Sequence, residues 1–172
     1  MTGEGGAFDP LRLLRTLQER GVRHVVIGGV AGALWGSPSA TFDLDICYAR
    51  DAGNLGRLAD ALSDIGARLR GVGEAVPFIL DAETLRNGDS FTFTTVAGDL
   101  DVLGTPQGSR GFEDLAAHAI RVDVGDGVVA LVVALDDLIR LKRAAGRGKD
   151  QAELPILEAL REEVDSADGD AG

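Results

Sequence analysis

The stretch GSPSATFDLDIC, residues 36–47, places two aspartates inside a run that otherwise has the pattern of a buried strand. Asp43 and Asp45 alternate with Leu44 and Ile46, and successive side chains of a strand point to opposite faces. The two carboxylates therefore project from one face, roughly 7 Å apart along the strand. The apolar side chains point the other way, towards a core.

Two carboxylates on one face repel each other, and a cation between them relieves that repulsion. Mg²⁺ suits such a site because it binds one or two carboxylates together with phosphate oxygens and water. The alternative for an isolated Asp-x-Asp pair is the solvated face of an edge strand, where the acids hold no ion. Three further features of the chain favour the metal site.

The first feature is the stretch DLDVLG, residues 99–104, which repeats the pattern because Asp99 and Asp101 also share one face. A strand paired beside the first would bring a third carboxylate to the same metal ions. The second feature is the pair Gly28-Gly29, which follows the strand HVVI and precedes a short helix. Bare glycine amides at a helix start suit a phosphate group. The alternative is that these glycines only permit a tight turn.

The third feature is Lys142. Leu135, Leu138 and Ile139 form one face of their predicted helix, and Lys142 falls in the middle of that face. The alternative is a lysine whose stem packs at the helix end while its amine reaches water. Taken together, two acid pairs, a phosphate-type turn and an inward lysine are the components of two-metal phosphoryl chemistry.

Length and composition set the frame for these motifs. The 172 residues predict one domain over residues 7–164, followed by a disordered acidic tail at 165–172. The formal net charge of −11 opposes non-specific binding to nucleic acid, although residues 140–149 contain five basic residues and no acidic one. The single cysteine, the lack of a signal-peptide pattern and the lack of a long apolar run predict a cytoplasmic protein without membrane attachment.

The order of elements predicts an α/β (α+β) chain with a mixed or antiparallel sheet flanked by helices. Expected strands cover residues 23–27, 42–48, 76–80, 90–96, 99–104, 120–124 and 128–133, with a turn region at 81–89. Expected helices cover 9–21, part of 28–36, 51–66, 112–119 and 135–145, with a last short helix near Asp150 that Pro155 interrupts.

Three stretches carry a resemblance to a known superfamily: VVIGGVAGALWGSPSATFDLDI, LDVLG and LDDLIRLKRAAGRGKD. The chain resembles the nucleotidyltransferase-fold superfamily, and in particular the small bacterial proteins related to AbiEii-type and MenT-type toxins, from about His24 to Leu160. This resemblance implies a Mg²⁺-dependent enzyme that moves a nucleotidyl group from an NTP to an acceptor hydroxyl. It also implies tRNA or a protein as acceptor and an antitoxin protein as partner.

The resemblance also implies roles for individual residues. It makes Asp43, Asp45 and Asp101 the ligands of two Mg²⁺ ions, with Asp99 as a competitor for the third position. It assigns the nucleotide to a second set of residues: Gly28, Gly29, Ser37, Thr41, Lys142 and Asp150.

Two positions depart from the superfamily's pattern, since Ser39 stands where an arginine is common and Trp35 where a histidine is common. These departures keep a second hypothesis open, namely a catalytically weak protein of this fold that binds a nucleotide or a partner protein.

Overall fold

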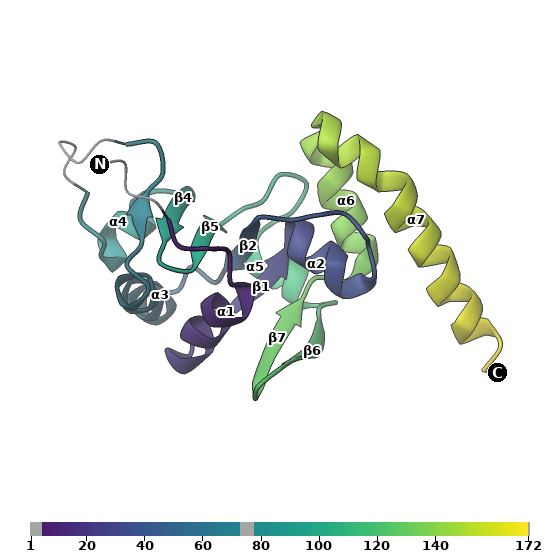
Figure 1. Cartoon of the computed structure of the whole chain (residues 1–172), viewed down its shortest axis with the longest axis horizontal. Helices are drawn as coiled ribbons and strands as arrows, with labels where there is room; N and C mark the ends of the chain where they lie inside the picture. The colour runs from purple at the N-terminus through teal and green to yellow at the C-terminus, as the bar shows by residue number, and fades with distance from the viewer. Residues whose placement is uncertain (1–4, 73–77, 172) are drawn as a thin grey trace.

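The computed structural model describes residues 5–72 and 78–171, and its strands form one seven-stranded mixed sheet (Figure 1). The order across the sheet is β3-β4-β5-β2-β1-β7-β6. The pairs β1/β7 and β2/β5 are parallel and all other pairs are antiparallel, which confirms the predicted mixed sheet. The strands are β1 (His24–Ile27), β2 (Asp43–Tyr48), β3 (Arg68–Leu69), β4 (Ser90–Thr95), β5 (Gly98–Leu103), β6 (Ile120–Gly125) and β7 (Val128–Val132).

Seven helices flank this sheet within the described residues. They are α1 (Pro10–Glu19), α2 (Gly28–Trp35), α3 (Ala52–Asp64), α4 (Ala82–Asn87), α5 (Phe112–Ala116), α6 (Leu135–Ala145) and α7 (Gly148–Gly169). Aspartate side chains cap the first turns of α1 and α3, since the Asp9 carboxylate accepts the N–H of Arg12 at 3.0 Å and the Asp51 carboxylate accepts that of Asn54 at 3.0 Å. None of the helices in residues 5–72 and 78–171 has the length and apolar character that a membrane span requires.

The segment before β4 differs from the prediction. Residues 76–77 of the expected strand lie outside the described residues, and Phe78–Leu80 belong to no strand. The Phe78 ring instead packs against Phe91 and Phe93 of β4, with ring centroids 6.2 and 6.1 Å apart. Phe78 therefore packs on the sheet rather than extending it, while Ile79 is exposed. The edge strand is the unpredicted β3, and the expected turn region contains α4, which Asp81 caps.

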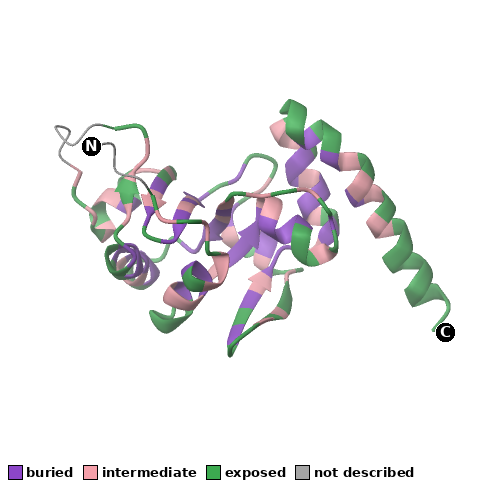
Figure 2. Cartoon of the chain, in the orientation of Figure 1, coloured by how far each residue is buried: buried purple, intermediate pink, exposed green. Residues whose placement is uncertain are grey.

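The C-terminal helix is longer than predicted, because α7 runs without interruption through Pro155. Pro155 removes one backbone N–H donor. Its side chain is exposed, while Leu157 two residues later is fully buried and holds the helix against the protein. The helix also continues into the segment expected as a disordered tail, and every described residue from Glu162 onward is exposed (Figure 2).

The core forms on one face of the central strands. Leu44 and Ile46 of β2 and Leu100 and Val102 of β5 are at most 1% exposed, while the aspartates between them lie on the opposite face. The alternation of apolar and acidic residues in the sequence therefore separates side chains that face the core from side chains that face the cleft.

Deletion of residues 165–172 tests how much the end of α7 contributes to stability. These residues bury no apolar side chain, so we expect the melting temperature to stay within about 1 °C of that of the full chain. Thermal unfolding followed by circular dichroism checks this. A fall of several degrees would show that this end packs against the protein in solution.

Candidate active site

A cleft of about 980 Å³ lies between the acidic face of the sheet and helices α6 and α7. Its lining includes the start of α2, the loop before β2, the half-buried aspartates of β2 and β5, and the first turns of α7. Every motif singled out in the sequence therefore contributes at least one residue to this cleft.

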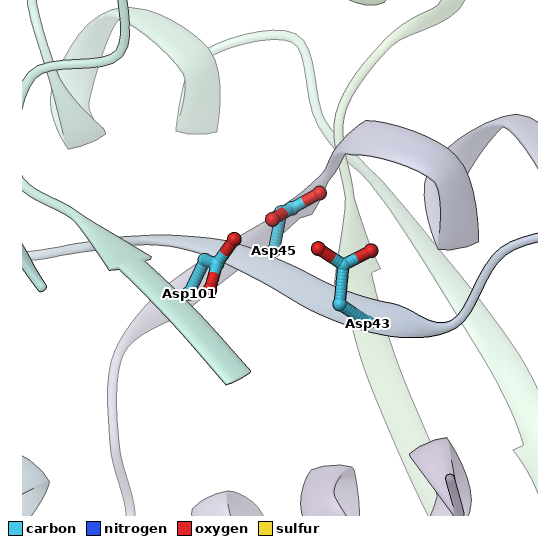
Figure 3. Close-up of side chains that lie close together, drawn as sticks. All are labelled: Asp43, Asp45 and Asp101. Carbon is cyan, nitrogen blue, oxygen red and sulfur yellow. The ribbon is translucent and has the colours of Figure 1, made fainter. Parts of the chain in front are cut away.

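Three carboxylates meet at the floor of the cleft. β2 and β5 run parallel in a register that places Asp45 beside Asp101 and Asp43 beside Asp99. One oxygen from each of Asp43, Asp45 and Asp101 lies within 4.8 Å of the other two (Figure 3). Oxygen ligands at this spacing fit one or two hard divalent cations.

Asp99 shares the face but has different partners. Its Oδ2 lies 3.4 Å from Nε of Arg70, and its Oδ1 accepts a hydrogen bond from the Thr94 hydroxyl at 3.3 Å. Arg70 also donates to Asp101 Oδ1 at 2.9 Å and to the carbonyl of Phe93 at 2.9 Å. Of the two candidates for the third acid, Asp101 lies beside Asp45 and joins the cluster, whereas Asp99 pairs with Arg70 and Thr94 outside it.

The three carboxylates carry more negative charge than the one guanidinium paired with them, that of Arg70, can balance. Burial, together with the charges of Asp43 and Asp101, raises the pKa of Asp45 to about 8. Burial also raises the pKa of Asp101, although the Arg70 guanidinium opposes this shift. The positive charge of Lys149 acts on Asp45 in the opposite direction. A divalent cation would replace the proton that such a cluster retains, so the donor set fits Mg²⁺.

The two glycines at the start of α2 are required by close approach. Gly28 has φ +67°, and a Cβ there would lie 2.1 Å from Oδ2 of Asp45. A Cβ on Gly29 would lie 2.6 Å from the Thr41 hydroxyl. Gly28 and Gly29 line the cleft, and no side chain of the described residues caps this start of α2, so the amides of its first turn have no side-chain acceptor.

The loop before β2 divides into a part that lines the cleft and a part that does not. Ser39 and Thr41 line it, and the Thr41 hydroxyl donates to the carbonyl of Asp43 at 3.2 Å. Ser37 is buried behind the cleft, where its hydroxyl donates to Glu153 at 3.2 Å. Trp35 anchors the end of α2, since its indole N–H donates to the carbonyl of Val133 at 2.9 Å.

Lys142 points inward as its position on the helix predicts, and its partners are two carboxylates of α7. Its Nζ lies 3.2 Å from Asp150 Oδ1 and 3.0 Å from Glu153 Oε2. The residue is only 8% exposed, so a lysine whose amine reaches water does not describe it. Arg147 donates to the second oxygen of Asp150 at 2.8 Å. Burial alone would raise the pKa of Asp150, but the hydrogen bonds from Arg147 and Lys142 hold it below its ordinary value.

Sequence reasoning missed Arg70, Glu153 and Lys149. Glu153 lies three residues after Asp150 and before Pro155, so the predicted short helix already places both carboxylates on one face, and this spacing is the signal that could have found it. Lys149 belongs to the basic run at residues 140–149. Arg70 follows a two-residue edge strand, and no sequence pattern marks it.

Comparisons with known proteins identify the arrangement of these elements. No family model matches the sequence, and no curated protein matches it either. Solved structures do match, among them the lincosamide antibiotic adenylyltransferase LnuA in its lincomycin-bound form, with a TM-score of 0.60 and 13% identity over 90% of this chain and 99% of that one. The chain has the nucleotidyltransferase fold.

Two further structures share this fold. TM1012 from Thermotoga maritima, assigned as a nucleotidyltransferase, has a TM-score of 0.51 and 17% identity over 94% of this chain and 97% of that one. The antibiotic-resistance factor ANT(2'')-Ia has a TM-score of 0.53 and 14% identity over 94% of this chain and 92% of that one. The similarity spans nearly the whole chain in each case, so the fold expected from the sequence is confirmed.

Asp45→Asn tests the carboxylate cluster through stability. An aspartate whose pKa rises from 3.8 to about 8 on folding contributes stability that is fully present below pH 3.8 and lost as the pH rises to about 8. In EDTA at pH 8, we therefore expect Asp45→Asn to be more stable than wild type, by about a few kcal/mol in the free energy of unfolding. This difference should shrink as the pH falls towards 5. Urea unfolding at several pH values measures this. Parallel curves for the two proteins would contradict the assignment.

Lys142→Met tests the buried ion pairs. Removing the amine leaves two buried carboxylates without their shared cation, so we expect a loss of about 3 kcal/mol in the free energy of unfolding. Arg143→Met is the matched control, because Arg143 pairs with Glu158 on the exposed side of the same helix and its loss costs under about 1 kcal/mol. Equal effects of the two variants in urea unfolding would contradict the inward role of Lys142.

Proposed function

We propose that this protein transfers a nucleotidyl group from a Mg²⁺-bound NTP to an acceptor hydroxyl. The observation that carries the proposal is the cluster of Asp43, Asp45 and Asp101, with carboxylate oxygens within 4.8 Å of one another, beside the glycine start of α2. The nucleotidyltransferase fold of the chain supports it, since LnuA is named an adenylyltransferase and TM1012 is assigned as a nucleotidyltransferase.

Each part of the cleft has a role in this reaction. Asp43, Asp45 and Asp101 hold the metal ions, which neutralise the phosphate charge when bound. The amides at Gly28 and Gly29 and the hydroxyl of Thr41 lie where the phosphates enter. The acceptor oxygen forms a bond to the α-phosphorus, the bond to the β-phosphate oxygen breaks, and pyrophosphate leaves with that electron pair. A carboxylate oxygen of Asp101 accepts the proton of the acceptor hydroxyl.

The acceptor that we favour is a small hydroxylated molecule. A net charge of −11 weakens attraction to RNA, and Lys142 and Arg147 in the cleft are already paired with carboxylates. LnuA is a relative in fold that holds the antibiotic lincomycin. A tRNA or protein acceptor and an antitoxin partner follow from the sequence resemblance, and they are the second version of this function.

The non-enzymatic alternative also has support. Arg70 holds one oxygen of Asp101, and Ser39 supplies no positive charge to the loop. A protein of this kind would bind Mg-NTP and transfer nothing.

Incubation with each of the four NTPs, labelled at the α-phosphate, tests the function in cell extract and in fractions of low molecular mass. We expect Mg²⁺-dependent incorporation of label into an acceptor, with at least a thousandfold loss in Asp45→Asn, on the scale of losing a transition-state charge partner. Label in a small product supports the first acceptor class, and label in tRNA supports the second. Saturable NTP binding without incorporation would support the non-enzymatic alternative.

A further inference from the structure

The cleft contains few cationic side chains, and they are not equivalent. Among the described residues, three basic side chains line it: Lys142, Arg147 and Lys149. They face six carboxylates in the same lining, from Asp43, Asp45, Asp99, Asp101, Asp150 and Glu153. A triphosphate that binds in this cleft needs a basic side chain that is not already paired with a carboxylate.

Two of the three cations are committed to α7. Lys142 lies 3.2 and 3.0 Å from carboxylate oxygens of Asp150 and Glu153, and its side chain is 10% exposed. Arg147 donates to Asp150 at 2.8 Å. To contact a phosphate, Lys142 would have to abandon two buried carboxylates and leave both without it, which is strongly unfavourable.

Lys149 differs from both in partner and in exposure. It makes no ion pair with any of the described residues, and its side chain is exposed in the first turn of α7. It lines the same cleft as Asp43 and Asp45, and its positive charge acts on the Asp45 carboxylate. A flexible, hydrated ammonium at the cleft wall is suited to follow phosphate oxygens, which it meets as a point charge.

We propose that Lys149, rather than Lys142, is the side chain that contacts the phosphates of the bound nucleotide. Lys142 is then a positioning residue, which holds α6 against α7 through Asp150 and Glu153 and so fixes the first turn of α7 at the cleft. This assignment rests on the proposed nucleotide-binding function.

Lys149 has opposite effects on the affinity of the site for its two ligands, the bare metal ion and Mg-NTP. Lys149 repels a bare metal ion, because it brings a positive charge towards the carboxylates that would hold it. It attracts the phosphates of Mg-NTP. Its removal therefore favours binding of the metal alone and disfavours binding of the nucleotide, a pair of effects that a structural role of the lysine would not produce.

Lys149→Met keeps the stem and removes the charge. Titration calorimetry of wild type and variant with Mg-ATP should show a loss of roughly tenfold to a hundredfold in affinity, the scale of one charge-assisted contact. Titration with Mn²⁺ alone should show equal or tighter binding in the variant. Lys149→Arg keeps the charge and should recover most of the affinity for Mg-ATP.

Arg121→Met on β6 is the matched control, since it removes one exposed positive charge outside the cleft. It should leave both titrations unchanged, and both Met variants should melt at the temperature of wild type. Equal affinity of wild type and Lys149→Met for Mg-ATP overturns the assignment of Lys149 alone. The other three Mg-NTPs are titrated in the same way, and absence of binding to wild type for all four overturns the proposed function together with it.

Discussion

The pairing of β2 with β5 determines the chemistry of this protein, because it holds three like charges together. Carboxylates whose oxygens lie within 4.8 Å repel one another, and partial burial increases the cost. They stay in place because the parallel register fixes their Cα positions, and because the other face of the same two strands is fully buried in the core. Burial of the apolar face of the sheet thus stabilises the carboxylate cluster on the opposite face against its own charge repulsion.

The wall of the cleft formed by α6 and α7 differs from the floor because its positive and negative charges balance. Lys142 and Arg147 are balanced by Asp150 and Glu153, so the junction of α6 and α7 is neutral and closed. Gly32 of α2 allows this closure, since a Cβ there would lie 2.7 Å from Glu153 Oε1. One wall is therefore a satisfied ion network that maintains shape, and the opposite floor is an unsatisfied acid cluster that is available to a ligand.

Local sequence patterns predicted how individual side chains of this site are oriented, but not which residues from other elements they contact. The alternation around Asp43 and Asp45 was sufficient to place both carboxylates on one face, and helical periodicity was sufficient to turn Lys142 inward. The choice between Asp99 and Asp101 required the parallel register of β2 and β5, which places Asp101 beside Asp45. The partners of Lys142 required the packing of α7 against α6, which brings Asp150 and Glu153 to its amine. Long-range packing decided each of these questions, and no local pattern encodes it.

The charge balance of the cleft links the metal to the nucleotide. In the part of the lining that the structure describes, six carboxylates face three basic side chains, two of which are already paired. A free triphosphate meets a negative potential at this surface, so it gains little from binding without divalent cations. Each metal ion that the acid cluster binds lowers that potential, and by linkage the nucleotide raises the affinity for the metal by the same factor. Metal and nucleotide therefore bind together as Mg-NTP. Lys149, which forms no ion pair with the described residues, raises the affinity for Mg-NTP relative to the affinity for the metal ion alone.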